Sequence, residues 1–258
     1  MSCIICSNKI NKVFKQRLLN KYDVQYNFCK NCGFLQTEKP YWLEEAYTKA
    51  IVSADTGLVF RNSLYSIKLS ILLYTMFGKN GCYLDYGGGT GLFVRMMRDI
   101  GFDFYWEDLF SENVHAQGFG FLPALVPYNA VTAFEVLEHI EDPVDFIRKI
   151  LFKTGAETII FSTELFEGKP PKPDDWWYYI PDVGQHISFY QKKTLEKIAI
   201  NFGFRFYSEG GLHMFTKIDF SELKFKAAVG KASKYIFPFI SFFMKSKTQS
   251  DHEKLLKL

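Results

Sequence analysis

Four cysteines near the start of the chain have a spacing that suits metal binding. They form two C-x-x-C pairs, Cys3 with Cys6 and Cys29 with Cys32. In a reducing compartment such pairs are metal ligands rather than disulfides, and a redox dithiol needs one pair, not two. Four thiolates match tetrahedral zinc and leave it no open position. The sequence therefore predicts a structural zinc ion in a small N-terminal module, residues 1–39.

A second chemically informative stretch, LDYGGGTGLF at 84–93, places four glycines in five positions. A nucleoside triphosphate loop ends in Gly-Lys-Ser/Thr, but Gly91 is followed by leucine. A dinucleotide-binding loop reads Gly-x-Gly-x-x-Gly, whereas the spacing here is Gly87-x-Gly89-x-Gly91. Asp85 precedes the first glycine by two residues, where a carboxylate suits a ligand with an ammonium group better than a pyrophosphate.

S-adenosylmethionine (SAM) is a ligand of that kind, with an amino-acid head, a ribose and no phosphate. Glycine lets backbone approach such a ligand at the carboxyl end of a strand, and the helix that follows favours its carboxylate. A second acid at the end of the next strand is expected to bind the ribose hydroxyls. The stretch FYWED offers Asp108, with Glu107 as the alternative.

Alternating strands and helices are expected to position these residues. Strands are predicted at 82–86, 102–106, 130–134 and 158–162, helices at 92–100, 111–117, 143–152 and 192–202, and a hairpin at 204–208 and 212–217. This alternation predicts an α/β fold, an open and mostly parallel sheet with helices on both faces. Around the sheet domain, residues 79–218, we expect a helical linker or cap at 40–78, an insert at 166–190, and an amphipathic tail at 219–258.

Three motifs in this order, DYGGGTG, WEDLF and AFEVLEHIEDP, resemble those of class I SAM-dependent methyltransferases. The resemblance covers roughly residues 80–217. It implies a Rossmann-like, seven-stranded sheet whose last strand is antiparallel. It also implies cofactor contacts at Asp85, Gly87, Gly89, Asp108 and Glu135.

The four-cysteine module together with GQHISFY at 184–190 resembles the zinc-containing methyltransferases that modify nucleotide-linked sugars or surface glycans. In that group, a histidine after the fourth strand and a later acid–histidine pair are functional, which implies roles for His139 and His186. Here Gln185 replaces the acid, and the chain is too short for the group's extra C-terminal domain. We therefore expect O-methylation of a sugar hydroxyl, with His186 or His139 as the base, rather than carbon methylation.

Aromatic side chains in the insert are the expected acceptor-binding residues, because aromatic rings can stack on a sugar. With Gln185, the candidates are Trp176, Trp177 and Tyr178. The expected acceptor is a sugar-containing small molecule or glycan. A net charge of +3 is too small to indicate a nucleic-acid partner by itself.

Two other functions compete with this one. An RNA methyltransferase would use the basic residues of the zinc module to bind phosphates; they are Lys9, Lys12, Lys15, Arg17 and Lys21. A non-catalytic binding module would keep a vestigial cofactor site.

Neither a leader peptide nor an apolar run of roughly 18 residues is seen, so a cytoplasmic enzyme is expected. The phenylalanine-rich tail is expected to pack on its own domain; the alternatives are contact with a membrane surface or with a second subunit. The sequence does not predict the oligomeric state.

Overall fold

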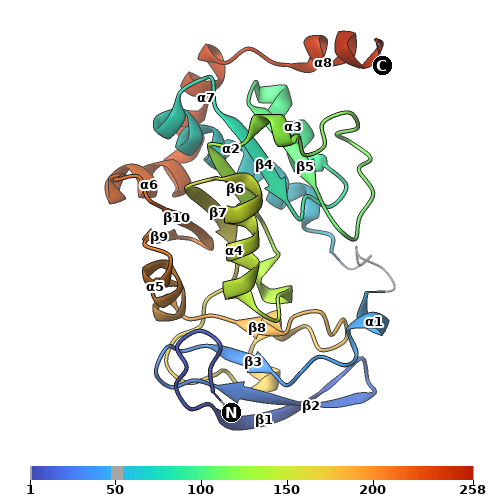
Figure 1. The fold of residues 1–258 in the computed structure, drawn as a ribbon, viewed down its shortest axis with the longest axis vertical. Coiled ribbons are helices and arrows are strands. Elements are labelled where there is room, and N and C mark those ends of the chain that lie inside the picture. The colour runs from blue at the N-terminus through green and yellow to red at the C-terminus, as the bar shows by residue number, and fades with distance from the viewer. Residues whose placement is uncertain (1, 48–54, 258) are drawn as a thin grey trace.

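The computed structural model describes residues 2–47 and 55–257, and it contains two β-sheets (Figure 1). Residues 48–54, which belong to the expected linker at 40–78, lie outside the described residues. The larger sheet has the order β5-β4-β6-β7-β10-β9. Its strands are β4 (Cys82–Tyr86), β5 (Asp103–Glu107), β6 (Ala130–Ala133), β7 (Thr158–Ser162), β9 (Arg205–Glu209) and β10 (Leu212–Thr216).

The larger sheet confirms the predicted α/β class. Strands β5, β4, β6 and β7 are parallel, and β10 runs antiparallel to both of its neighbours. In the described part of the chain the sheet has six strands, where seven were expected. Beside β5 a single parallel bridge joins Trp106 to Gly120. The segment that would form the seventh strand is therefore limited to one bridge at the sheet's edge.

Helices cover both faces of this sheet (Figure 1). They include α2 (Leu58–Phe77), α3 (Leu92–Ile100), α4 (Pro143–Thr154) and α5 (Lys192–Asn201). Helix α4 shows why these elements begin and end where they do. Its N-cap, Asp142, accepts a hydrogen bond from the amide of Asp145 at 2.9 Å, and proline at the first position is already shaped for a helix. It ends at Gly155, whose φ of +61° suits a C-terminal glycine.

The helix predicted at 111–117 is wrong, because this segment consists of bends and a turn. The side chain of Asn113 accepts a hydrogen bond from the amide of Ala116 and donates one to its carbonyl, both at 2.9 Å. Such local bonds from an asparagine side chain compete with the backbone bonds of a helix.

A smaller antiparallel sheet contains the N-terminal residues and one strand of the insert. Its order is β1 (Asn11–Leu18), β2 (Tyr22–Phe28), β3 (Leu35–Thr37) and β8 (Ser188–Phe189). Helix α1 (Leu43–Ala46) follows, and the indole of Trp42 donates to the carbonyl of Gly184 at 2.8 Å. The insert is thus part of the N-terminal sheet, which places the residues before β8 between the two sheets (Figure 1).

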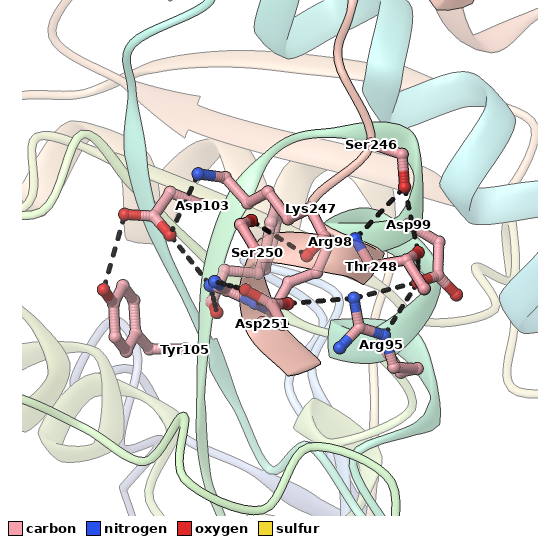
Figure 2. Close-up of polar contacts among 11 residues, drawn as sticks. Arg95, Arg98, Asp99, Asp103, Tyr105, Ser246, Lys247, Thr248, Ser250 and Asp251 are labelled. Atoms are coloured by element: carbon pink, nitrogen blue, oxygen red, sulfur yellow. Dashed lines mark hydrogen bonds and ion pairs between the residues drawn. The ribbon is translucent and has the colours of Figure 1, made fainter. Parts of the chain in front are cut away.

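The tail forms α6 (Glu222–Val229), α7 (Ser233–Phe243) and α8 (Thr248–Leu255), and α6 and α7 pack against α2. Helix α8 is held by a buried ion pair, in which the guanidinium of Arg98 donates to both carboxylate oxygens of Asp251 at 2.8 and 2.7 Å (Figure 2). Arg98 also donates to Asp103 at 2.8 Å. Among the described residues, no helix is both long and apolar enough to cross a membrane.

Candidate active site

A cavity of about 720 Å³ opens at the carboxyl ends of β4, β6 and β7. The ends of parallel strands meet at one edge of an open sheet, which is where such sheets bind ligands. Residues from six parts of the chain line it: the glycine loop, the first turns of α2, the segment after β6, the segment after β7, the insert, and the turn between β9 and β10.

The glycine loop forms one wall of the cavity, and its backbone adopts conformations that favour glycine. Gly87 has φ +78° and Gly89 has φ +53°. A Cβ on Gly87 would lie 2.7 Å from a methyl carbon of Val136, so a side chain there would clash. The start of α3 also faces the cavity through Thr90 and Leu92. Bare backbone and a helix N-terminus together fit the amino-acid part of SAM.

Asp85, the penultimate residue of β4, lines the cavity, yet its residue exposure is 3%. Its carboxylate accepts a hydrogen bond from the hydroxyl of Thr132 at 2.6 Å. Burial raises the pKa of Asp85 to about 7; the Thr132 hydrogen bond opposes this shift and the charge of Asp108 adds to it. A desolvated carboxylate that meets the cavity is suited to an ammonium group, because pairing with a cation offsets the cost of burying its charge.

The two acids at the end of β5, Glu107 as its last residue and Asp108 directly after it, have different neighbours. Asp108 accepts a hydrogen bond from the amide of Gly89 at 2.9 Å, so it lies beside the glycine loop, although it is not among the residues that line the cavity. Glu107 instead forms an ion pair with Lys153. The other oxygen of Asp108 accepts hydrogen bonds from the amides of Phe110 and Ser111 at 2.7 and 2.8 Å, so of the two acids left open by the sequence, Asp108 is the one that lies beside the glycine loop.

Glu135 follows β6 in a left-handed conformation, with φ +53°, and lines the cavity. The hydroxyl of Ser162 accepts a hydrogen bond from the Glu135 amide at 2.8 Å and donates one to the Glu135 carboxylate at 2.5 Å. Arg61 and Tyr65 of α2 lie on its other side, with the Arg61 Nε 3.8 Å and the Tyr65 hydroxyl 3.5 Å from the carboxylate. Arg61 and Tyr65 were not among the residues predicted from the sequence, because residues 40–78 were expected only to form a helical linker or cap.

The two histidines expected to be functional, His139 and His186, lie together, with ring centroids 4.9 Å apart. His139 belongs to a short 3₁₀ helix, Leu137–His139, and both rings line the cavity. The Nδ1 of His139 lies 3.1 Å from the carbonyl oxygen of Gln185, and that of His186 lies 2.7 Å from the carbonyl oxygen of Tyr178. A carbonyl can only accept, so each Nδ1 carries the proton and each Nε2 keeps a lone pair.

Both histidines are neutral at physiological pH. Burial lowers the pKa of His139 to about 4. Burial, followed by the charge of His139, lowers the pKa of His186 to about 3. Each Nε2 can therefore accept a proton or a metal ion, but neither imidazole is a strong base by itself.

Glu138 adjoins these histidines, and the sequence analysis did not select it. It is fully buried, and neither of its carboxylate oxygens has a hydrogen-bond partner in the described part of the chain. Burial and then the charge of Glu135 raise its pKa to about 8, while the hydroxyls of Tyr178 and Thr163 act in the opposite direction. The Glu-His pair in AFEVLEHIEDP was the available signal, but nothing local indicated that this acid would be enclosed.

The aromatic residues of the insert are divided between the cavity and the protein core. Trp177 is 70% exposed and lines the cavity, as does the buried Tyr178. Trp176 does not line it and packs instead against Phe166, Tyr179 and Phe189 in the core of the N-terminal sheet. Gln185 lines the cavity, and its amide donates to the carbonyl of Ala46 at 2.8 Å.

The four N-terminal cysteines form a cluster whose sulfur atoms all lie within 4.8 Å of one another. The Sγ atoms of Cys3 and Cys32 are 3.5 Å apart, as are those of Cys6 and Cys29. Zinc–sulfur bonds of about 2.3 Å in a tetrahedron place sulfur atoms roughly 3.8 Å apart, so the cluster fits a zinc ion. None of the four lines the cavity.

Comparison with known proteins identifies the family. Residues 61–209 match the family model described as a methyltransferase domain. The chain belongs to this methyltransferase domain family. With its α/β sheet, the protein is a SAM-dependent methyltransferase of the class I fold.

Two solved structures to which the chain is similar are distant in sequence. Magnesium protoporphyrin IX methyltransferase from Synechocystis PCC 6803 with bound SAM is 15% identical, with 68% of this chain and 89% of that chain covered and a TM-score of 0.44. The plantazolicin methyltransferase in complex with SAH is 12% identical, with 70% and 79% covered and a TM-score of 0.47. No curated protein matches this methyltransferase.

Proposed function

We propose that this methyltransferase transfers the methyl group of SAM to a sugar hydroxyl of its acceptor, which is a free sugar, a nucleotide-linked sugar or a glycan. The observation that carries the proposal is a single cavity with the glycine loop on one side and the paired histidines on the other. A cofactor bound along the loop and an acceptor bound at the histidines would meet inside it.

The charge of the cavity supports a cationic cofactor and an acceptor without phosphates at the reacting end. Its charged lining residues are four acids and one arginine: Asp55, Asp85, Glu135, Glu164 and Arg61. This excess of carboxylates favours the sulfonium and ammonium groups of SAM and repels phosphates. The basic residues of β1 are exposed and do not line the cavity. The charge pattern therefore favours a sugar over RNA.

Each of the cofactor residues has a role that follows from its position. Asp85 holds the ammonium group, the backbone at Gly87 and Gly89 allows close approach, and Asp108 accepts hydrogen bonds from the ribose. Glu135 completes the polar wall beside the glycine loop. When bound, SAM supplies a methyl group on a sulfonium, which an acceptor oxygen takes as the hydroxyl loses its proton. Alignment of the two reactants supplies most of the acceleration in such a transfer.

The acceptor hydroxyl is expected to meet His139 and His186, since their Nε2 atoms are proton acceptors at the cavity wall. One of them takes the hydroxyl proton as a general base. Trp177 offers an exposed ring for a sugar face at the mouth of the cavity, and Tyr178 and Gln185 supply polar groups deeper in. Trp176 has a packing role.

The four cysteines are proposed to bind a structural zinc ion. The hydroxyl of Thr194 donates to the carbonyl of Cys32 at 2.7 Å, and the amide of Asn201 donates to the carbonyl of Ile5 at 3.3 Å. Both donors belong to α5, so a zinc ion at the cysteines would also hold the N-terminal segment against the methyltransferase domain.

The first test is calorimetric titration of the purified protein with S-adenosylhomocysteine, with zinc measured on the same sample. We then measure transfer of a radiolabelled methyl group from SAM to nucleotide sugars, free glycans and RNA. Transfer to a sugar hydroxyl, lost in the His139→Ala and His186→Ala variants, supports the proposal. Transfer to RNA with no transfer to any sugar contradicts it, even when the cofactor binds.

A further inference from the structure

A cluster of possible metal ligands, separate from the four cysteines, contains two residues that line the cavity, His139 and His186, and one buried residue that does not, Glu138. Among the described residues, Glu138, His139 and His186 each place one ligand atom within 4.8 Å of the other two. We infer that these three side chains form a second metal site, which binds one divalent transition-metal ion at the acceptor end of the cavity. The inference rests on the proposed function only for what the ion does, not for where it binds.

The histidines are held as metal ligands are usually held. A metal-bound imidazole almost always donates its other ring N–H to a carbonyl or carboxylate, which fixes the tautomer and the orientation of the ring. Both rings have such a bond already, from His139 to the carbonyl of Gln185 and from His186 to that of Tyr178. Each ring therefore presents an unprotonated Nε2 in the absence of any ion. Two rings in contact, both fixed in this tautomer, are more than packing requires.

Glu138 supplies the independent evidence. Glu138 has 0% exposure, and its carboxylate oxygens form no hydrogen bond of normal geometry in the described chain, although the hydroxyls of Tyr178 and Thr163 are close enough to lower its pKa. Burying such a carboxylate is costly, and a bound ion or water would stabilise it. The two neutral imidazoles beside it have no acidic proton left to donate through Nε2. A cation bound between the three groups would neutralise the carboxylate and use both lone pairs.

The ligand types indicate which ions would bind. Two imidazoles and one carboxylate form a three-ligand set used by zinc and by iron(II), with the remaining positions open. Imidazole ligands favour such transition ions over magnesium and calcium, which prefer oxygen. Ligand atoms around an ion with bonds near 2.1 Å lie about 3 to 4.2 Å apart, so a small closing of the three side chains is enough.

An ion at this position would replace the histidine base of the proposed function, because both Nε2 lone pairs would bind the ion. His139 and His186 line the cavity, so the open positions of the ion face the proposed acceptor hydroxyl. A hydroxyl bound to such an ion would lose its proton to water near neutral pH, and the methyl group of SAM would then be transferred to the oxygen. Because several positions are open, acceptors with two neighbouring oxygens, such as the vicinal hydroxyls of a sugar, would bind best.

The test is metal binding to the whole protein without cofactor or acceptor. Zinc is first measured to account for the cysteine site, and Mn²⁺ is then titrated and followed by loss of the free-ion signal in electron paramagnetic resonance. Mn²⁺ prefers oxygen and nitrogen over thiolates, so it reports on the second site. We expect one Mn²⁺ per chain in addition to the zinc. Wild-type protein that binds no Mn²⁺ and no Co²⁺ overturns the inference and leaves a buried water as the partner of Glu138.

The matched variants are Glu138→Gln and Glu164→Gln, which make the same chemical change in the cluster and outside it, at the cavity wall. Loss of outer-shell partners alone costs roughly 10–100-fold in metal affinity, so Glu138→Gln is expected to lose at least that much and Glu164→Gln to stay within a few-fold. Equal affinities in the two variants contradict the site. His186→Gln repeats the test if Glu138→Gln does not fold.

Titration with S-adenosylhomocysteine separates this inference from the proposed function. Cofactor binding without Mn²⁺ binding overturns the metal site and leaves the methyltransferase proposal intact. Mn²⁺ binding without any methyl transfer to sugars supports the metal site and counts against the proposed acceptor.

Discussion

Replacing Asp85 with asparagine is expected to weaken cofactor binding and, at the same time, to stabilise the cofactor-free fold. Asparagine has nearly the same shape and can still accept the hydrogen bond from Thr132, which is 2.6 Å long in the wild type. The substitution therefore removes little except the buried negative charge. A residue kept for function at the expense of stability should show these two opposite effects.

The stability change follows from the raised pKa of Asp85. Burial moves this pKa from 3.8 to about 7, and each unit corresponds to about 1.4 kcal/mol, so the ionised form costs up to about 4 kcal/mol. Because the folded pKa is above the unfolded one, the contribution of Asp85 to stability is most favourable below pH 3.8 and becomes less favourable as the pH rises to 7. The asparagine variant is thus expected to gain most at pH 8, roughly 10 °C in Tm, and almost nothing near pH 4.

The binding change has the opposite sign. A hydrogen bond to a charged group contributes about 1.5–3 kcal/mol, so S-adenosylhomocysteine should bind the variant roughly 10–150-fold more weakly at pH 8. In the wild type, Asp85 must lose a proton before it can hold the ammonium group. Wild-type affinity should therefore fall up to tenfold for each pH unit below 7, whereas the affinity of the variant stays flat over the same range.

The assays are calorimetric titrations and thermal melts between pH 5 and 8. Thr132→Val provides an internal check, because the Thr132 hydrogen bond lowers the pKa of Asp85 and its loss should move the midpoint of the affinity curve to higher pH. Wild-type affinity that does not change from pH 8 to pH 5 would refute the ammonium role. An asparagine variant that is no more stable than the wild type at pH 8 would refute the desolvation argument.

Three further predictions concern structural support. Asp251→Ala should lower the free energy of unfolding in urea by about 3 kcal/mol, because it leaves the buried Arg98 with Asp103 as its remaining carboxylate partner. The control is Asp99→Ala, which removes a half-exposed partner of Arg95 and should change this free energy little. Gly87→Ala should cost about 1–2 kcal/mol at its left-handed φ and abolish S-adenosylhomocysteine binding, since the new Cβ clashes with Val136. Removing zinc should increase hydrogen exchange in β1–β3 before β4–β7.

Much of the fold could be predicted because its signals are local. The boundaries of β4, α3 and β7 agree with the prediction from sequence, since each is a short apolar strand or an amphipathic helix between glycine turns. The glycine loop and the paired cysteines were equally visible, because their chemistry depends on neighbours in the chain. The helix expected at 111–117 is wrong because side-chain hydrogen bonds of Asn113 replace helical ones, and the sheet has six strands in the described chain rather than the seven that the resemblance implied.

The sequence by itself therefore determined the α/β class, the loop that suits SAM, and which residues could bind zinc. Tertiary structure alone decided what faces the cavity. Of two adjacent tryptophans, Trp176 packs in the core and Trp177 lines the cavity, and nothing in the local sequence distinguishes them. His139 and His186 meet because the insert pairs with the N-terminal sheet and returns past β6, and the same packing encloses Glu138 without a partner. Desolvation depends on everything that surrounds a group, so the raised pKa values of Asp85 and Glu138 could not be read from their neighbours in the chain.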